Sequence, residues 1–137
     1  MTALTAERDT QRRNGEKSAA PVAASTKILG GSIVCMNAAG YATKGATATT
    51  LKSLGMAEAT VDNSAGAAGD QTVPYRRDGW FRFANSASAD AITLADVNAN
   101  AYIVDDQTVA KTDGTSTRSV AGVIRDVDAR GVWISFP

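Results

Sequence analysis

The sequence predicts a mainly β fold: a compact β-barrel or β-sandwich-like domain of short antiparallel strands, with one short helix and an extended N-terminal arm. Three observations support this prediction. Apolar runs are short and are separated by Gly, Asn, Asp and Ser, a pattern typical of short strands joined by turns. A chain of 137 residues suits one domain that can bury a core without disulfides. Its N-terminal segment carries few large apolar side chains.

Residues 1–20 are predicted to form the arm, and residues 21–137 the β-rich domain. Only Met1 and Leu4 are large and apolar in the arm, and its charges alternate in sign without helical periodicity. Such a segment cannot bury enough surface to offset its ordering entropy. We therefore expect it to lie along a partner chain, the alternative being an arm packed on its own domain. The predicted arm contacts are Arg8, Arg12 and Arg13.

The body is predicted as strands and turns in order. Expected strands cover residues 21–25, 32–37, 41–44, 54–61, 102–105, 109–111, 120–127 and 132–136. Gly55 indicates a bulge or a close backbone approach within its strand. Thr93 can cap the one predicted helix, over residues 94–98. In the last strand, Val132, Ile134 and Phe136 are expected on one face, because side chains alternate along a strand.

The stretch from residue 73 to residue 84 is the most aromatic part of the chain. At its centre, Asp78-Gly79 is a strong signal for a two-residue hairpin, because a type I′ turn needs positive φ at both central positions. The sequence therefore predicts a hairpin here, and Phe81 and Phe83 are expected to anchor its inner face.

In that hairpin Arg77 lies opposite Trp80, and Tyr75 lies opposite Arg82. Arginine beside an aromatic ring on an outward face favours contact with a partner. The alternative is an ordinary solvated hairpin with snorkelling arginines. Paired arginines also suit carboxylates of another protein. The predicted second interaction surface consists of Arg76, Arg77, Trp80 and Arg82.

The two halves of the chain resemble each other. One series contains Ile33-Val34, Lys44, Gly55 and Gly79, and the other contains Ile103-Val104, Lys111, Gly122 and Gly131. A weak duplication would explain the match and predicts two units that close on each other. Chance similarity between β-hairpins is the alternative.

Several chemistries lack the residues that they need. The chain has no histidine, so Ser-His-Asp and Cys-His arrangements are excluded. Cys35 is the only cysteine, which excludes an internal disulfide and the usual zinc sets, and we expect it to be a buried apolar residue. No phosphate-binding glycine motif occurs. We therefore expect no enzyme, no cofactor and no metal site. Asp105-Asp106 is interpreted as a turn. Asp126 and Asp128 lie on one face of a strand end and could in principle help to hold calcium, but neither acidic cluster has the number of ligands that such a site needs.

The charge balance argues against nucleic acid as a partner. Fourteen basic and 14 acidic residues give a net charge of zero, whereas nucleic-acid binding normally needs a basic surplus. No stretch is apolar enough to span a membrane, and no early apolar run suggests a signal peptide. A lone thiol fits a reducing compartment.

A set of segments in fixed order resembles a family of small tailed-phage and prophage proteins, the capsid decoration (cement) proteins, formerly catalogued as a domain of unknown function. The resemblance covers roughly residues 20–137. It is carried by Leu54-Gly-Met-Ala-Glu-Ala-Thr-Val-Asp-Asn63, Arg82-Phe-Ala-Asn-Ser86, Asp90-Ala-Ile-Thr93, Ala101-Tyr-Ile-Val-Asp-Asp-Gln-Thr-Val-Ala-Lys-Thr112, Ser119-Val-Ala-Gly-Val-Ile-Arg-Asp-Val-Asp128 and Gly131-Val-Trp133.

The resemblance implies a structural protein made in the cytoplasm of a bacterial host and placed on the outer surface of the virion. It would form a homo-oligomer, a trimer by this resemblance, and bridge major capsid protein subunits. The family has no catalytic residues to carry over. The alternatives are a tail-tube, fibre or head-completion protein, or a carbohydrate-binding β module that stacks sugars on Trp80 and Tyr75. Trp133 and Phe136 are expected in the core or in an oligomer interface.

Overall fold

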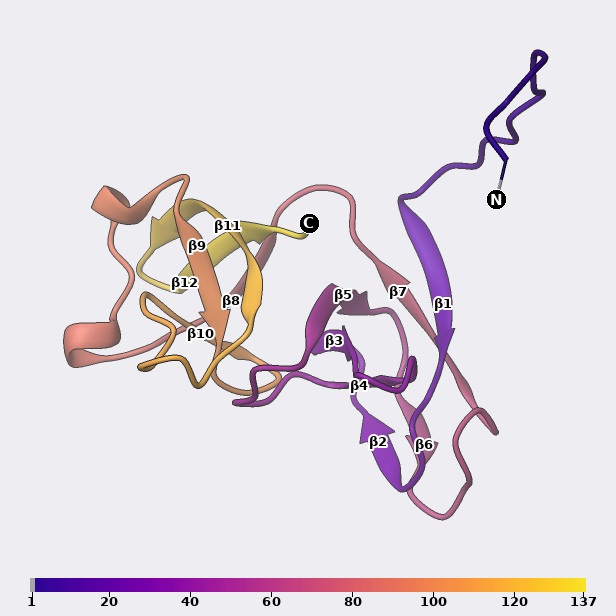
Figure 1. The fold of residues 1–137 in the computed structure, drawn as a ribbon. Coiled ribbons are helices and arrows are strands. Elements are labelled where there is room, and N and C mark those ends of the chain that lie inside the picture. The colour runs from indigo at the N-terminus through magenta and orange to yellow at the C-terminus, as the bar shows by residue number, and fades with distance from the viewer. Residues whose placement is uncertain (1) are drawn as a thin grey trace.

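The computed structural model describes residues 2–137 and shows two β units side by side, with an N-terminal arm projecting from one of them (Figure 1). The fold is mainly β, as the sequence predicts. Across the described residues the strands are β1 (Lys17–Pro21), β2 (Thr26–Ile28), β3 (Ile33–Met36), β4 (Ala42–Lys44), β5 (Lys52–Ala57), β6 (Val61–Asn63), β7 (Thr72–Arg76), β8 (Phe81–Asn85), β9 (Asn100–Ile103), β10 (Thr108–Ala110), β11 (Val120–Asp128) and β12 (Gly131–Ser135).

The N-terminal unit, residues 17–76, is a five-stranded antiparallel sheet in the order β1-β7-β5-β3-β4. Just after β1, a parallel bridge between Val22 and Ala42 brings its two edge strands together. The short ribbon β2-β6 completes this unit. The sheet is therefore curved almost into a barrel.

The C-terminal barrel, residues 81–135, is closed in the order β10-β8-β12-β11-β9. The closing pair β8-β10 is parallel, and the other pairs are antiparallel. Full closure leaves the barrel without a free sheet edge, which protects it from unwanted strand pairing.

The two units have the same strand pairing, so the predicted internal duplication corresponds to a real structural repeat. The series β4-β3-β5-β7-β1 matches β10-β9-β11-β12-β8. Val34 pairs with Gly55 in the first unit, and Ala101 pairs with Gly122 in the second, at the same sequence offset. Lys44 and Lys111 are separated by that offset as well.

Two of the predicted equivalences are wrong. Ile33 does not match Ile103, because the pairings of β3 with β5 and of β9 with β11 align Val34 with Ala101. Gly79 does not match Gly131, because Gly79 precedes β8 whereas Gly131 begins β12, the counterpart of β7. The matching apolar pairs in the sequence were too similar to one another to fix the register.

The two equivalent glycines meet the same local constraint. The register shifts by one residue next to each of them, so each lies at a β-bulge. A Cβ on Gly55 would overlap the carbonyl oxygen of Arg76, and a Cβ on Gly122 would overlap that of Ser135. The prediction of a close backbone approach at Gly55 is therefore confirmed, and only glycine fits both sites.

The buried side chains form two clusters that share strand β3. Val34 packs in the cluster of the N-terminal unit, whereas Ile33 and Cys35 pack with residues of the C-terminal barrel. Side chains alternate across a strand, so one strand serves both cores. Cys35 is fully buried, and burial raises the pKa of its thiol to about 12, as expected of a small apolar residue.

The inner face of the last strand is confirmed. Val132 and Ile134 are fully buried and Phe136 is nearly so. The ring of Phe136 packs against Phe81 at 5.4 Å and against Phe83 at 6.0 Å between ring centroids. These aromatic rings close the C-terminal barrel next to the end of the chain.

The predicted hairpin around Asp78-Gly79 is wrong. Strand β7 pairs with β1 and β5, whereas β8 pairs with β12 and β10, so the two strands belong to different units. Residues 77–80 connect the units instead, and Gly79 supplies the positive φ of 82° for that bend. The local turn signal was sound, but both edges of each strand are taken by other partners, which the signal could not show.

The predicted helix is shorter than expected. It is a 3-10 turn, Leu94–Asp96, held by a capping box in which the Thr93 backbone N–H donates to Asp96 Oδ2 at 2.8 Å. A turn follows over residues 97–99, with a φ of 73° at Asn98, and strand β9 begins at Asn100. A second 3-10 turn covers Ser88–Asp90, and no α-helix occurs within residues 2–137. None of the helical segments described could cross a membrane.

The arm also ends earlier than predicted. Strand β1 starts at Lys17, so the last residues of the predicted arm belong to the folded body, and the strand expected at 21–25 lies at Lys17–Pro21. The cause is Ala20, which is buried opposite Val73 and holds this segment against β7. A small side chain gives no strong hydrophobic signal in the sequence.

Candidate interaction surfaces

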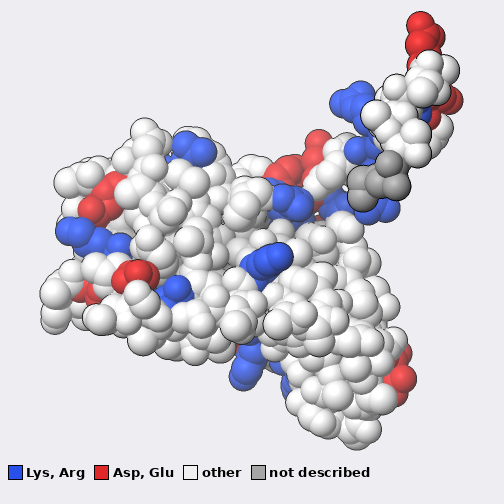
Figure 2. Space-filling model, viewed as in Figure 1, with Lys and Arg blue, Asp and Glu red and all other residues white. Residues whose placement is uncertain are grey.

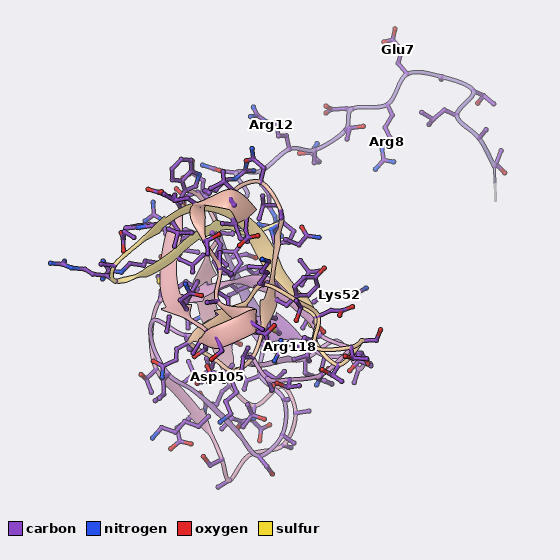
Figure 3. The ribbon with its side chains drawn as sticks, turned by 90° about the vertical axis from the view of Figure 1, so that its left-hand side faces the viewer. Glu7, Arg8, Arg12, Lys52, Asp105 and Arg118 are labelled. Carbon is purple, nitrogen blue, oxygen red and sulfur yellow. The ribbon has the colours of Figure 1, made fainter. Side chains whose placement is uncertain are left out.

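The arm over residues 2–16 lies outside the folded body, and every residue in it is exposed (Figures 1 and 2). Arg8, Arg12 and Arg13 form no ion pair within residues 2–137. Figure 3 shows Glu7 and Arg8 on the arm, apart from the two units, and Arg12 nearer the body. The arm joins the body where the Arg77 backbone N–H donates to the carbonyl oxygen of Glu16 at 2.9 Å.

The arm is long compared with the body that carries it. At about 3.3–3.6 Å per extended residue, this segment can reach about 50 Å from Lys17. Leu4 is its only large apolar residue in the described part and is 72% exposed. An exposed chain of this reach, with three arginines that no described carboxylate pairs with, can contact a neighbouring molecule without disturbing the fold.

The predicted second surface is largely engaged within the chain. Arg76 makes a two-pronged ion pair with Asp78, with Nε–Oδ1 at 2.5 Å and Nη2–Oδ2 at 3.1 Å. This hydrogen bonding lowers the pKa of the Asp78 carboxyl and raises the pKa of the Arg76 guanidinium. The Arg76 guanidinium, which was predicted to bind a carboxylate of a partner protein, therefore already binds the carboxylate of Asp78.

Arg77 is also occupied, whereas Trp80 is open to solvent. Arg77 Nη2 donates to the carbonyl oxygen of Pro137, which ties the connection between the units to the last residue. Trp80 is 57% exposed and lies between β7 and β8, outside both strands. Of these two residues, only Trp80 presents an open apolar surface.

Arg82 has a different aromatic partner from the predicted one. Tyr75 is only 7% exposed and cannot pair with Arg82 on an outer face. Instead, the Arg82 guanidinium lies over the Trp133 ring at 5.6 Å from its centroid. Trp133 Nε1 donates to Asp128 Oδ2 at 2.8 Å, and this bond is the main cause of the lowered pKa of Asp128.

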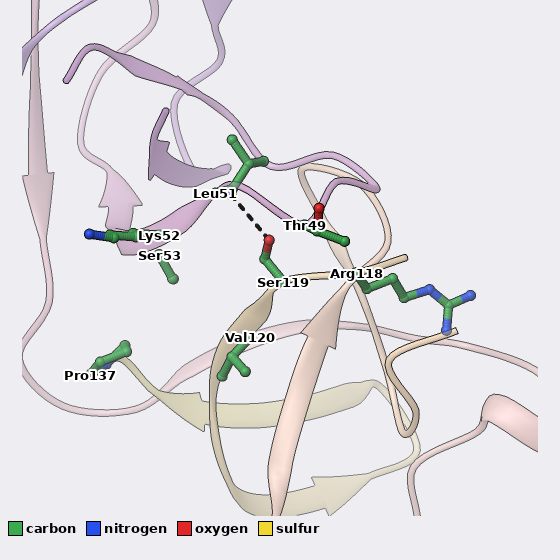
Figure 4. Close-up of a pocket in the computed structure, with 8 residues that line it drawn as sticks. All are labelled: Thr49, Leu51, Lys52, Ser53, Arg118, Ser119, Val120 and Pro137. Atoms are coloured by element: carbon green, nitrogen blue, oxygen red, sulfur yellow. Dashed lines mark hydrogen bonds between the residues drawn. The ribbon is translucent and has the colours of Figure 1, made fainter. Parts of the chain in front are cut away.

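An apolar groove between the units escaped prediction from the sequence. It has a volume of about 520 Å³ and is lined mainly by apolar surface. Figure 4 shows its walls, among them Thr49, Leu51, Lys52, Val120 and Pro137. These residues come from three separate segments, so no local pattern could reveal the groove before the packing of β5 against β11 was known.

One hydrogen-bond network fixes the floor of the groove. The Leu51 backbone N–H donates to Ser119 Oγ at 3.2 Å, and the Ser119 hydroxyl in turn donates to the carbonyl oxygen of Ala48 at 2.5 Å. Ser119 is buried, so this network links the loop before β5 to the start of β11. These two hydrogen bonds therefore join the segments that form two of the walls of the groove.

The groove is basic as well as apolar. Its lining contains Lys52 and Arg118 and no acidic residue among those described. Arg118 Nη1 forms an ion pair with Asp90 Oδ2 at 3.2 Å, which compensates the positive charge of Arg118. Lys52 is exposed and makes no ion pair with any residue from 2 to 137. An acidic partner segment would therefore meet one uncompensated cation at the edge of an apolar surface.

Within the described part of the chain, no three His, Cys, Asp or Glu side chains gather closely enough to suggest a metal site. Comparison of the chain with protein-family models, with curated proteins and with solved structures finds no match.

Proposed function

We propose that this chain is a structural protein of a tailed-phage virion, which decorates the outer surface of the icosahedral capsid and bridges major capsid protein subunits. The observation that carries the proposal is the arm over residues 2–16. It is fully exposed, bears arginines that pair with no carboxylate in residues 2–137, and can reach about 50 Å from a compact body. A tether of this kind suits a protein whose work is to hold neighbours together.

The proposed mechanism depends on multiple contacts. The body rests on one capsid subunit while the arm reaches a second one, so the second contact forms at a high effective concentration. Each contact can then be weak by itself. A symmetric oligomer, which we propose to be a trimer, multiplies the contacts again.

The matched halves of the body fit this role. The N-terminal unit and the C-terminal barrel share one strand order. Two units with one strand order give the body two similar backbone frameworks, and such a body suits a shell made of repeated subunits. The open indole of Trp80, 57% exposed, is the strongest candidate for an apolar anchor on the body.

The test is binding to capsids that lack this protein. The wild-type chain should bind in hundreds of copies per particle and should raise the temperature at which particles release DNA. A variant lacking residues 2–14 should fold normally but bind more weakly, because it leaves β1 intact from Lys17. Unchanged binding of this variant would overturn the role of the arm, and a handful of copies would favour a connector or tail protein.

A charge-reversal pair sharpens the experiment. Replacing Arg8, Arg12 and Arg13 by Glu should weaken capsid binding, because these side chains pair with no carboxylate within residues 2–137. The matched control reverses three exposed charges of the body, at Lys27, Lys44 and Arg130. Equal losses in both variants would indicate a net-charge effect and would contradict specific arm contacts.

The structure lacks the pair of exposed aromatic rings that the carbohydrate-binding alternative requires at Tyr75 and Trp80. Tyr75 is 7% exposed and packs in the core of the N-terminal unit, so it cannot stack a sugar beside Trp80. The exposed indole of Trp80 alone lacks the paired aromatic surface on which that alternative depends.

A further inference from the structure

The groove between the two units and the tip of the arm have complementary chemistry. The groove is apolar, and Lys52 is the charge in its lining that pairs with no carboxylate of residues 2–137. The arm from Thr2 to Asp9 contains one large apolar side chain, Leu4, followed by Glu7, Arg8 and Asp9, which are two carboxylates and one cation. Two of the arm's basic residues, Arg12 and Arg13, lie closer to the body along the chain.

We propose that the groove of one copy of this chain binds the arm tip of a second copy, with Leu4 in the apolar groove and Glu7 or Asp9 beside Lys52. Leu4 is 72% exposed in the single chain, so docking would remove its main unfavourable contact with water. This inference rests on the proposed function and deepens it, because it names how copies join: the arm tip reaches a second copy, while Arg12 and Arg13, nearer the body, face the capsid. Contact between copies can be measured without capsids. The contact can therefore be absent while capsid binding is observed, and capsid binding can be absent while the contact is observed.

Distances permit the exchange. Glu7 lies three residues beyond Leu4, so its carboxylate comes within about 10 Å of the docked leucine in an extended chain. Lys52 also lines the groove, and Figure 4 shows its amine on the side of the groove away from Thr49. The arm's reach of about 50 Å exceeds the roughly 15 Å radius of gyration expected for a chain of this size.

A second copy fits better than the same chain. In the structure the arm leaves the body at Lys17 and points away from both units (Figures 1 and 3). Exchange of identical segments between copies is a low-cost route to oligomers, because every copy supplies one arm and one groove. A closed ring of such contacts would bury each Leu4 and occupy each Lys52.

Disulfide trapping in the full-length protein tests the contact. A size-tagged Leu4→Cys chain is mixed with an untagged Thr49→Cys chain, since Thr49 is on the groove wall. Cys35 is fully buried and stays unreactive. The control partner carries Ala129→Cys on the exposed turn between β11 and β12. The proposal predicts a mixed disulfide with Thr49→Cys and little with Ala129→Cys.

Other outcomes of the trapping experiment overturn the proposal. Equal trapping at both positions would show random collision. A chain carrying both Leu4→Cys and Thr49→Cys supplies the second check, because exchange between copies predicts cross-linked oligomers. Closure of that chain on itself at every protein concentration would show that the arm docks on its own groove, and it would reject exchange.

Equilibrium sedimentation supplies an independent measurement. Leu4→Ser should weaken self-association by about 10- to 100-fold, because a buried leucine contributes about 1.5–3 kcal/mol. Lys52→Glu should weaken it about two- to fivefold, as expected of an exposed ion pair. Combining Lys52→Glu with Glu7→Lys and Asp9→Lys should restore it, whereas additive loss in the combined variant would contradict the pairing.

Discussion

Gly55 and Gly122 occupy the same place in the two units: each lies at a β-bulge and against a carbonyl oxygen, of Arg76 in one case and of Ser135 in the other. Strands β7 and β12, which lead to those oxygens, can approach β5 and β11 only because no Cβ intervenes. The two contacts show that the corresponding strands approach each other in the same way in both units.

Substitution of either glycine by alanine should destabilise the fold. The added methyl group must displace backbone, and overpacking of this kind costs about 1–3 kcal/mol. Urea denaturation of Gly55→Ala and Gly122→Ala should show lower midpoints. Gly15→Ala is the matched control, because a Cβ at that position would have nothing within 4 Å, and its midpoint should not move. Wild-type stability in the first two variants would contradict the close approach.

Two deletions should separate the arm from the fold. At protein concentrations at which the chain is monomeric, removal of residues 2–14 should leave the melting temperature unchanged, since these residues are exposed. Removal of residues 2–20 also removes most of β1 and the buried Ala20, which exposes an edge of β7. We expect this longer deletion to melt at a lower temperature or to aggregate. Equal melting temperatures for the two deletions would contradict the pairing of β1 with β7.

The Arg76–Asp78 ion pair should make stability depend on pH. The pKa of Asp78 is lowered in the folded chain, so its contribution is fully present above the ordinary carboxyl value of 3.8 and is lost as pH falls through the lowered folded value. Asp78→Asn should therefore be less stable than wild type at neutral pH, and the difference should vanish in strong acid. Asp9→Asn in the exposed arm is the matched control, and it should leave stability at neutral pH unchanged in the same denaturation assay.

The two tryptophans should behave differently in fluorescence. Trp80 is 57% exposed, whereas Trp133 is covered by Arg82 and hydrogen-bonded to Asp128. Trp80→Phe should remove most of the emission that acrylamide quenches and should change stability by less than about 0.5 kcal/mol. Trp133→Phe should retain the quenchable emission. Equal quenching of the two single-tryptophan proteins would contradict these environments.

Features that are determined by residues close together in the sequence could be predicted. Alternation placed Val132, Ile134 and Phe136 on the buried face, and Gly55 indicated the close approach. The prediction failed at residues 73–84, because the Asp78-Gly79 bend joins two units and does not close a hairpin. A turn sequence does not show which distant strands will pair with the edges of the strands on either side of it. The groove was missed for a related reason, since its walls meet only after folding.

Strand β3 has a consequence for how the molecule unfolds. Ile33 and Cys35 face one cluster and Val34 faces the other, so this strand is a wall common to both. Unfolding of either half would expose apolar side chains in the core of the other half to water. The repeated halves should therefore melt together, with calorimetric and van't Hoff enthalpies that agree. Two units that look separate should therefore unfold in one cooperative transition.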